Sequence, residues 1–228
     1  MTTKKQLLLT AFLLISVFFF FEYSATDIII QDFFFDKASA SWLLSHKNGS
    51  LLDMLFYTGI KAVLIGFGTA MLVLYIYSFR NTPKGLALKG YRRGLFVVWT
   101  ALLTVPLLIG ALKAATNTPC PCHFTRYGGE YPHIKVLDTM PTYITKKFKC
   151  FPAGHASGGF ALLSLFFLFK TQRNRQRAIF AALGIGWSMG LYKMVIGDHY
   201  LSHTLITMIM SWFIILLIYK ISSLLHQK

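Results

Sequence analysis

Six long apolar segments, separated by polar loops, constrain this 228-residue chain more than any other feature. A bilayer core about 30 Å thick needs about 20 consecutive apolar residues in a helix. The six segments run Leu7–Glu22, Leu52–Phe79, Gly94–Ala114, Ser157–Phe169, Ala178–Ile196 and Leu205–Leu225. The fourth is short unless it begins at the glycines and alanines before it. We therefore expect an all-α, polytopic membrane protein, with six transmembrane helices in one domain over residues 1–228.

The composition agrees with a chain that is surrounded by lipid. Hydrophobic residues make up 55% of the sequence and charged residues only 14%, whereas a soluble domain of this length carries more charge on its surface. Lys4 and Lys5 before the first segment also fit a secretory signal peptide. Because Ser24 and Ala25 make only a weak cleavage site, we expect this segment to remain as a helix.

Basic residues set an orientation for the predicted helices. The net charge is +15, and Lys and Arg gather in alternate loops, as the positive-inside rule requires. All eight acidic residues lie at or near the opposite face. We predict that both termini are cytoplasmic and that residues 23–51, 115–156 and 197–202 face outward. The basic residues on the cytoplasmic side are Lys4, Lys5, Arg80, Lys84, Lys89, Arg92, Arg93, Lys170, Arg173, Arg175, Arg177, Lys220 and Lys228.

The positive charge also bears on possible partners. A basic chain can bind nucleic acid, but no RNA- or DNA-binding module is visible in this sequence, so we expect no nucleic-acid partner. The outward loop 23–51 carries Phe33, Phe34, Phe35 and Trp42. These aromatic side chains suit an amphipathic helix that lies in the membrane interface, near the point where a lipid enters.

A histidine at the start of the fourth segment is the first candidate for chemistry. In the stretch Pro152-Ala-Gly-His155, the proline suits the approach to a helix, and Gly154 lets backbone N–H groups come close to a ligand. A helix N-terminus attracts phosphate because its N–H groups are unpaired and its dipole end is positive. From that position, His155 is able to donate a proton to a leaving oxygen.

Two further elements are predicted to end at the same membrane face. His199 and His203 lie four residues apart, so both rings share one helix face, and His203 is a possible partner that fixes the tautomer of a nucleophilic His199. Lys113 lies at the outer end of the third segment, where a lysine is costly in lipid and function is the default hypothesis. The convergence of the three elements predicts phosphate chemistry at an outward-facing membrane surface.

These elements together resemble the type-2 phosphatidic acid phosphatase superfamily, whose members are six-helix membrane enzymes. Its three motifs read KxxxxxxRP, PSGH and SRxxxxxHxxxD, and here they correspond to residues 113–121, 152–155 and 192–203. The Cys-Pro, Phe-Pro-Ala-Gly-His and His-x-Leu-Ser-His stretches are similar to those of a variant bacterial branch. That resemblance implies the bacterial inner membrane, with the active site facing the periplasm.

The resemblance also implies a role for each matched residue. His199 would be the nucleophile that forms a phosphohistidine, and His155 the general acid for the leaving group. Lys113 and Lys193 would hold phosphate oxygens, and the backbone N–H groups near Gly154 would stabilise the phosphoryl group in the transition state. Water would then resolve the intermediate, and the route needs neither a metal nor another cofactor.

Several positions depart from the family pattern. Arg126, in the Arg-Tyr-Gly-Gly stretch, becomes the candidate to replace the motif arginine as a phosphate ligand. His203 gives no negative charge to a developing imidazolium, although its neutral ring is able to accept a hydrogen bond from the nucleophile. The replaced positions are Cys120 for Arg, Ala153 for Ser, Lys193 for Arg, His203 for Asp, and Thr204 where the variant branch often has Asp.

Two charged residues near these motifs have simpler explanations. Asp198 suits a negative charge at a helix N-terminus, where the helix dipole favours it. Lys61, near the start of the second segment, is explained by a side chain that extends to the membrane interface. We therefore assign neither of them to the predicted site.

The three cysteines all lie in the predicted outward loop 115–156, on an oxidising face. Cys120 and Cys122 are too close for an easy mutual bridge, so we expect Cys150 to pair with one of them and to tie the first motif to the second. The enclosed loop is worth about 3–4 kcal/mol in the chain-entropy model. The Cys-Pro-Cys-His stretch lacks a second pair of ligands, which disfavours a metal site.

The leading hypothesis is a phosphatase that hydrolyses a phosphomonoester or diphosphate of a membrane lipid. Lipid A, undecaprenyl diphosphate, phosphatidylglycerol phosphate and phosphatidic acid are the candidate substrates, and the sequence does not choose among them. A phosphotransferase, in which an acceptor lipid replaces water, and a non-catalytic phospholipid-binding protein are the alternatives. A transporter is disfavoured because paired broken helices and midplane charges are absent from the pattern. The pattern does not predict an oligomeric state.

Overall fold

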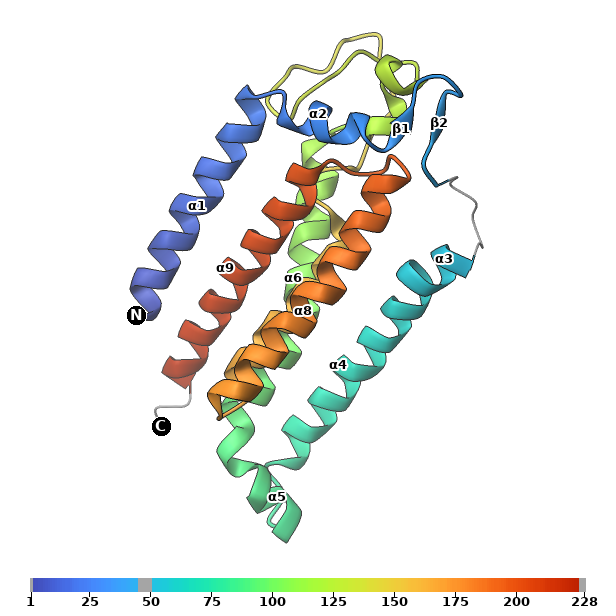
Figure 1. Ribbon diagram of the computed structural model, residues 1–228. Helices are drawn as coiled ribbons and strands as arrows, with labels where there is room; N and C mark the ends of the chain where they lie inside the picture. The colour runs from blue at the N-terminus through green and yellow to red at the C-terminus, as the bar shows by residue number, and fades with distance from the viewer. Residues whose placement is uncertain (1, 45–50, 226–228) are drawn as a thin grey trace.

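A computed structural model describes residues 2–44 and 51–225 of the chain, which form a helical bundle with a cap at one end (Figure 1). Five helices are long and apolar enough to cross a membrane, and both ends of the described chain lie at the end of the bundle opposite the cap. The helices and strands are α1 Thr3–Tyr23, α2 Thr26–Asp32, β1 Phe35–Asp36, β2 Ser41–Trp42, α3 Leu51–Asp53, the π-helical η1 Met54–Gly59, α4 Ile60–Tyr77, α5 Pro83–Leu88, η2 Lys89–Tyr91, α6 Arg92–Thr116, η3 Pro121–His123, η4 Thr125–Tyr127, α7 Gly154–Ala161, η5 Leu162–Phe167, α8 Gln172–Val195 and α9 Leu201–Leu225.

The prediction of six transmembrane helices is confirmed in part. Five of the predicted segments correspond to α1, to α3–η1–α4 and to α6, α8 and α9. The fourth forms only the apolar helix Gly154–Phe167, which is shorter than a typical span. After Ala161 the α-helix α7 tightens into the 3₁₀ helix η5, and the hydroxyl of Thr171 then caps the start of α8. The segment nevertheless leads from the cap end of the bundle, where α7 begins, to the opposite end, where α8 begins (Figure 1).

The centre of the bundle consists of α6, α7, α8 and α9, with α1 packed on α9 and α4 packed on α6 (Figure 1). The inner face of α6 repeats every four residues, at Val97, Ala101, Val105 and Ile109, all fully buried. This spacing follows the helix period of 3.6 residues, so the four side chains form one stripe. The stripe points at α7, which lies in the interior of the bundle.

Glycines allow α7 and α8 to approach closely. A Cβ added at Gly159 would lie 2.6 Å from the Cα of Gly186, and one added at Gly186 would lie 2.4 Å from the ring of Phe160. Small residues let helix backbones pack at short distance in a membrane, where lipid gives no hydrophobic drive between helices. This contact fixes the depth and direction of α7, whose first turn enters the candidate site.

A cap covers the end of the bundle at which α7 begins. It consists of α2, the β1–β2 hairpin and the loop 117–153, joined by a small aromatic cluster. Trp42 packs over Gly197, where an added Cβ would lie 2.3 Å from the indole. The buried amide of Gln31 donates to the carbonyl of Met194 at 2.8 Å. The predicted interfacial helix in residues 23–51 thus corresponds in part to α2, which has seven residues.

Candidate active site

Lys113 enters the site because it continues the buried stripe of α6. It lies four residues after Ile109, in the last turn of the helix, so its side chain leaves the same inner face. An added Cβ at Gly154 would lie 3.4 Å from the Cδ of Lys113 and 3.8 Å from its Nζ. The predicted convergence of the first and second motifs is therefore present, and the glycine gives the lysine room to pass.

The first turn of α7 supplies backbone donors at the same place. Ala153 is the N-cap residue, and its side chain cannot cap the helix. The N–H of Ala153 itself donates to the Oγ1 of Thr207 on α9 at 2.9 Å, which attaches the start of α7 to α9. The following N–H groups, from Gly154 and His155, lie at the positive end of the helix dipole, which suits an anion.

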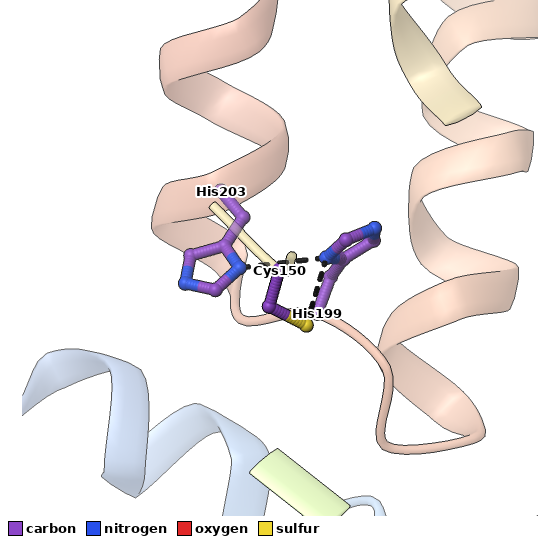
Figure 2. A group of neighbouring side chains, drawn as sticks. All are labelled: Cys150, His199 and His203. Atoms are coloured by element: carbon purple, nitrogen blue, oxygen red, sulfur yellow. Dashed lines mark hydrogen bonds between the residues drawn. The ribbon is translucent and has the colours of Figure 1, made fainter. Parts of the chain in front are cut away.

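The side chains of His199 and His203 meet at the N-terminal end of α9 (Figure 2). His199 lies in the turn just before α9, and His203 lies in its first turn. The two Nδ1 atoms are 3.4 Å apart, and both side chains are buried. The prediction that these rings meet is confirmed, although His199 precedes the helix instead of starting it.

The ring centroids of His155 and His199 are 6.1 Å apart, and the two ring planes are tilted by 52°. The Nε2 of His199 is buried and has no hydrogen-bond partner among the residues that the structure describes. Burial, followed by the positive charges nearby, lowers the pKa of His199 well below its usual value. A neutral imidazole nitrogen with a free lone pair is the form that attacks a phosphorus atom.

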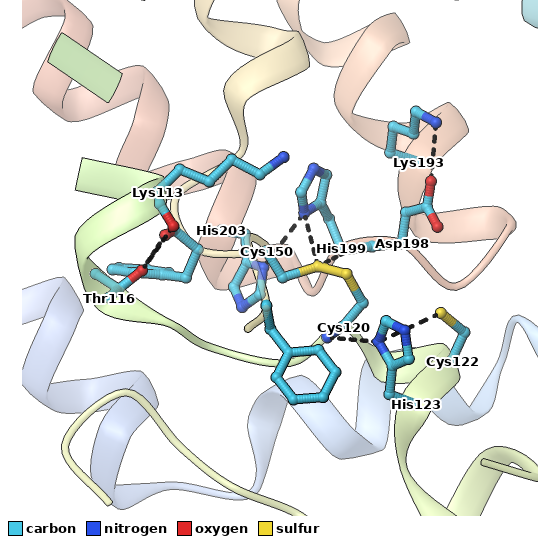
Figure 3. Close-up of a disulfide and its surroundings, with 12 residues drawn as sticks. Lys113, Thr116, Cys120, Cys122, His123, Cys150, Lys193, Asp198, His199 and His203 are labelled. Carbon is cyan, nitrogen blue, oxygen red and sulfur yellow. Dashed lines mark hydrogen bonds and ion pairs between the residues drawn. A yellow bond between two sulfur atoms is a disulfide. The ribbon is translucent and has the colours of Figure 1, made fainter. Parts of the chain in front are cut away.

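Lys193 lies at the end of α8 and is held by Asp198 in the following turn. The Nζ of Lys193 is 2.8 Å from an Oδ of Asp198, and only 7% of the lysine side chain is exposed. Asp198 therefore holds this ammonium group (Figure 3), and its positive charge acts on His199. The positive charges of Lys193, Lys113 and Lys61 all act on His155, so the site is electropositive.

A disulfide joins Cys120 to Cys150 directly beside the histidines (Figure 3). The Sγ of Cys150 lies 3.8 Å from the Nδ1 of His199, and Cys122 keeps a free thiol. The predicted bridge from Cys150 to one of the two neighbouring cysteines is confirmed, and the structure selects Cys120. The bridge ties the loop after α6 to the segment that leads into α7, as predicted.

Comparison with known proteins decides the family. A family model described as the PAP2 superfamily matches residues 94–226, which is more than half of the chain. The chain belongs to the PAP2 superfamily. No curated protein and no solved structure matches it significantly. Membership in the PAP2 superfamily indicates phosphatase chemistry on phosphate esters.

The match covers every element of the site in this PAP2 chain. It begins at the start of α6 and ends at the end of α9, so Lys113, His155, Lys193, His199 and His203 all lie within it. At the position of the first motif's arginine, however, this chain has Cys120, which is bonded to Cys150. The positive charge of the site therefore comes from lysines.

Arg126 is not brought to the histidines. Its Nε and Nη2 bind the two carboxylate oxygens of Asp32 at 2.8 and 2.5 Å, in a bidentate pair on the cap. Hydrogen bonds from Arg126 hold the pKa of Asp32 well below its usual range. The pair attaches α2 to the loop that follows Cys120. The guanidinium N–H groups that would bind a phosphate in a bidentate way are already bound to the carboxylate of Asp32.

An apolar cavity of about 530 Å³ in this PAP2 chain leads to His155. Leu64 and Leu72 of α4 and Leu102 and Pro106 of α6 line its walls, and His155 is also among the lining residues. Other lining residues, Ile65, Leu103 and Leu107, are half or more exposed, so the cavity opens on the outer surface of the bundle.

The prediction that Lys61 lies outside the site and extends to the membrane interface is incomplete. Lys61 lines the cavity together with His155, instead of only extending to the interface. A lysine near the start of an apolar segment is common at membrane surfaces, so its residue type and position give no sign of the cavity. Only the packing of α4 beside α6 and α7 places it there.

Proposed function

We propose that this chain is a membrane phosphatase that hydrolyses a phosphomonoester or diphosphate of a lipid through a phosphohistidine at His199. The observation that carries this proposal is the position of His155. Its ring centroid lies 6.1 Å from that of His199, and the residue also lines the apolar cavity. A phosphate held between the two rings would therefore leave its apolar substituent in the cavity, which suits a lipid and not a soluble ester.

In the first step, the Nε2 of His199 attacks the phosphorus atom. The bond from phosphorus to the lipid oxygen breaks, and His155 gives that oxygen a proton. His199 keeps its own proton on Nδ1, and this N–H donates a hydrogen bond to the Nδ1 of His203, 3.4 Å away. His203 thus sets the tautomer that leaves the Nε2 lone pair free, which is the role of the family's aspartate.

In the second step, water attacks the phosphohistidine. His155, now without its proton, takes a proton from the water, and the N–P bond breaks to release inorganic phosphate. The products are phosphate and a lipid alcohol, or a lipid monophosphate where the substrate is a diphosphate. His199 and His155 return to their first protonation states, so the cycle closes without a cofactor.

Phosphate oxygens are bound by Lys113, by Lys193 and by the N–H groups of the first turn of α7. These groups come from α6, α8 and α7, so the negative charge of the transferring phosphoryl group is neutralised from three directions. Asp198 holds Lys193 in place through their ion pair. Arg126 does not bind the phosphate in this proposal, because its guanidinium N–H groups are already bound to Asp32.

We place the protein in the bacterial inner membrane with the cap in the periplasm. The support is the distribution of charge: the basic loop at α5 and the start of α8 lie at the end opposite the disulfide and the cap. A structural disulfide also fits an oxidising compartment. The site would then act on lipid phosphates in the outer leaflet.

Phosphate release from a panel of lipid phosphates by the purified chain in detergent tests the proposal. Release from at least one lipid, and none by His199→Ala, is the expected result. Release that persists in His199→Ala contradicts the mechanism. Binding without release favours a non-catalytic lipid-binding protein, and transfer of the phosphate to a second lipid favours a phosphotransferase.

A matched pair of glycines on α4 tests the role of the cavity. Gly68 lines the cavity, whereas Gly66 does not, and an added Cβ at Gly66 meets nothing within 4 Å. Gly68→Leu is expected to lower kcat/KM for a long-chain lipid phosphate several-fold and to leave a short soluble phosphomonoester nearly unchanged. Gly66→Leu is expected to affect neither. Equal changes of kcat/KM for the lipid phosphate in the two variants would contradict a role of the cavity in substrate binding.

A further inference from the structure

Cys150, His199 and His203 form a compact group of ligand atoms in the part of the chain that the structure describes. One sulfur or nitrogen atom from each lies within 4.8 Å of the others, and all three side chains are buried (Figure 2). The Nδ1 atoms of the two histidines are 3.4 Å apart, and the Sγ of Cys150 is 3.8 Å from the Nδ1 of His199.

These separations match those of zinc ligands. With Zn–N bonds of about 2.05 Å, a Zn–S bond of about 2.3 Å and tetrahedral angles, two nitrogen ligands lie about 3.3 Å apart and a nitrogen and a sulfur about 3.6 Å apart. The distances from His199 to His203 and to Cys150 differ from these by only a few tenths of an ångström, and the ligand atoms of Cys150 and His203 lie within 4.8 Å of each other. Two imidazoles and one thiolate are also a ligand set that zinc accepts, with its fourth position left open.

The disulfide prevents this group from binding a metal ion. The Sγ of Cys150 is bonded to the Sγ of Cys120, so it carries no negative charge and is a poor ligand. The ammonium of Lys113 also acts on both histidines and opposes a bound cation. A thiolate at Cys150 would supply the negative charge that the two neutral imidazoles lack.

We propose that reduction of the Cys120–Cys150 disulfide turns Cys150, His199 and His203 into a three-ligand site for a thiophilic divalent cation such as Zn²⁺. A dithiol reductant passes two electrons and two protons to the disulfide, which gives two thiols while the reductant becomes a cyclic disulfide. Binding of the cation then displaces the thiol proton of Cys150 into solvent. The metal binds His199 at Nδ1, so the proton of that ring moves to Nε2.

The consequence for catalysis rests on the proposed function, whereas the binding itself does not. A ring that is metallated at Nδ1 and protonated at Nε2 has no lone pair with which to attack phosphorus. The chain would therefore be held inactive while its disulfide is reduced and metal is present. Exchange with a disulfide reagent would re-form the Cys120–Cys150 bond, reduce that reagent to two thiols with the thiol proton of Cys120 and one proton from solvent, expel the cation and release the nucleophile.

Cobalt(II) is the probe, because a thiolate bound to it gives a charge-transfer absorption that imidazoles alone do not give. The full-length chain in detergent is reduced with dithiothreitol, freed of reductant without oxygen, and titrated with Co²⁺. We expect one Co²⁺ per chain with the thiolate band, and no band from the oxidised chain. No band from the reduced chain, or the same band from the oxidised chain, overturns the proposal.

Variants locate the ligands without relying on activity. The double variant Cys120→Ser/Cys122→Ser leaves the Cys150 thiol free, and it is expected to bind Co²⁺ with the same band before any reductant is added. Cys150→Ser is expected to lose the band, and His203→Ala to lose it or to bind much more weakly. Cys122→Ser alone is the control and is expected to behave as the unmodified chain. A band that survives in Cys150→Ser overturns the assignment, and so does its absence from the double variant.

Zinc inhibition separates the metal site from the proposed function. We expect Zn²⁺ to abolish lipid phosphate release by the reduced chain and to leave the oxidised chain unaffected. If the chain binds Co²⁺ as described but releases no phosphate in any state, the metal site stands and the proposed function fails. If the oxidised chain releases phosphate and the reduced chain binds no Co²⁺, the proposed function stands and the metal site fails.

Discussion

The site depends on two histidines whose surroundings differ. His199 is 2% exposed and has a buried neighbour at Nδ1, whereas His155 lines an open cavity. A buried neutral ring suits a nucleophile, and a ring in contact with the cavity suits exchange of a proton with a leaving group and then with water. Each role follows from the position of the residue and not from its type.

Substitution of each histidine separates these roles. We expect His199→Ala to lower phosphate release to background, because no other described side chain supplies a nucleophile at this position. His155→Ala is expected to lower kcat by about 10²–10⁴-fold, the usual contribution of a general acid. Lipid phosphates with more acidic leaving groups should recover part of the His155→Ala loss, and an equal loss for all leaving groups would contradict its role as the acid.

Asp27 gives stability a defined dependence on pH. Its carboxylate accepts the backbone N–H of Ser202 at 2.9 Å, and burial raises its pKa from 3.8 to about 6. The folded chain therefore binds a proton between about pH 4 and pH 6 that the unfolded chain has lost. The stability that this proton contributes is present below pH 4 and is lost as pH rises through about 6.

The variant Asp27→Asn isolates this effect. His199, whose pKa is lowered, shifts stability in the opposite direction over part of the same range, so the difference between the two proteins is the quantity to measure. We expect the stability of the unmodified chain relative to Asp27→Asn to fall by about 1–3 kcal/mol from pH 4 to pH 7. A difference that stays constant with pH would contradict the raised pKa.

The convergence of the site residues is largely predictable from the sequence, because each lies in a recognisable stretch at the outer end of a predicted helix. Lys113, His155, His199 and His203 were found in this way, and their convergence is confirmed by the geometry. The pairing of Arg126 with Asp32 was not predictable, because the two residues are 94 positions apart and no local pattern joins them. The choice of Cys120 over Cys122 was equally open, since both positions allow loops of almost equal length.

At the scale of elements, short contacts position the site more than helix propensity does. α7 has only eight residues and is held on one side by Gly159 against α8 and on another by the bond from Ala153 to Thr207. The apolar pattern predicted that this segment is a helix, but hydrophobicity alone does not show where a helix tightens into a 3₁₀ turn. The short hairpin of β1 and β2 was missed because four residues carry little signal.

The contact between α7 and α8 gives a direct test of packing. Gly159→Ala would force its Cβ to 2.6 Å from the Cα of Gly186, so we expect a loss of about 1–3 kcal/mol and a lower Tm in detergent. Gly184→Ala on the same helix pair is the control, since nothing lies within 4 Å of its added Cβ. It should be neutral or slightly stabilising, as alanine favours a helix over glycine. Equal Tm values for the two variants would contradict the close approach.

The disulfide links two elements that carry different motifs, and its contribution to stability is measurable. We expect Cys150→Ser to lower the Tm under oxidising conditions by an amount that corresponds to about 2–4 kcal/mol. In reducing buffer the same substitution should have little further effect. Cys122→Ser, which removes the free thiol, is the control and should change the Tm in neither buffer. A loss of the same size in both buffers would mean that the cysteine acts through packing alone.

At the scale of the whole molecule, one end of the bundle carries the candidate site, and the other carries basic loops without acidic residues. The cap, the disulfide and the histidines share one end, and α5 and the start of α8 share the other (Figure 1). The sequence predicted this polarity because charge is distributed along the chain in the same order as the helices. The cavity was not predictable, since its walls come from helices that are paired only in the folded bundle.

Cysteine labelling tests the proposed orientation. In a Cys122→Ser background, Glu130→Cys and Arg173→Cys place single thiols at exposed positions near opposite ends of the bundle. We expect a membrane-impermeant maleimide to label residue 130 in intact cells and to label residue 173 only after the membrane is opened. Labelling of residue 173 in intact cells would reverse the orientation and move the site to the cytoplasmic face.

The central claim is that the lipid's phosphate passes through His199. The most direct measurement is to mix the purified chain with a lipid phosphate that it hydrolyses, quench in alkali, where phosphohistidine survives, and locate the phosphate by mass spectrometry of the peptides. We expect a phosphate on His199 that disappears with time, and none in His199→Ala. Phosphate on another residue, or continued turnover with no phosphorylated histidine at any time point, would contradict it.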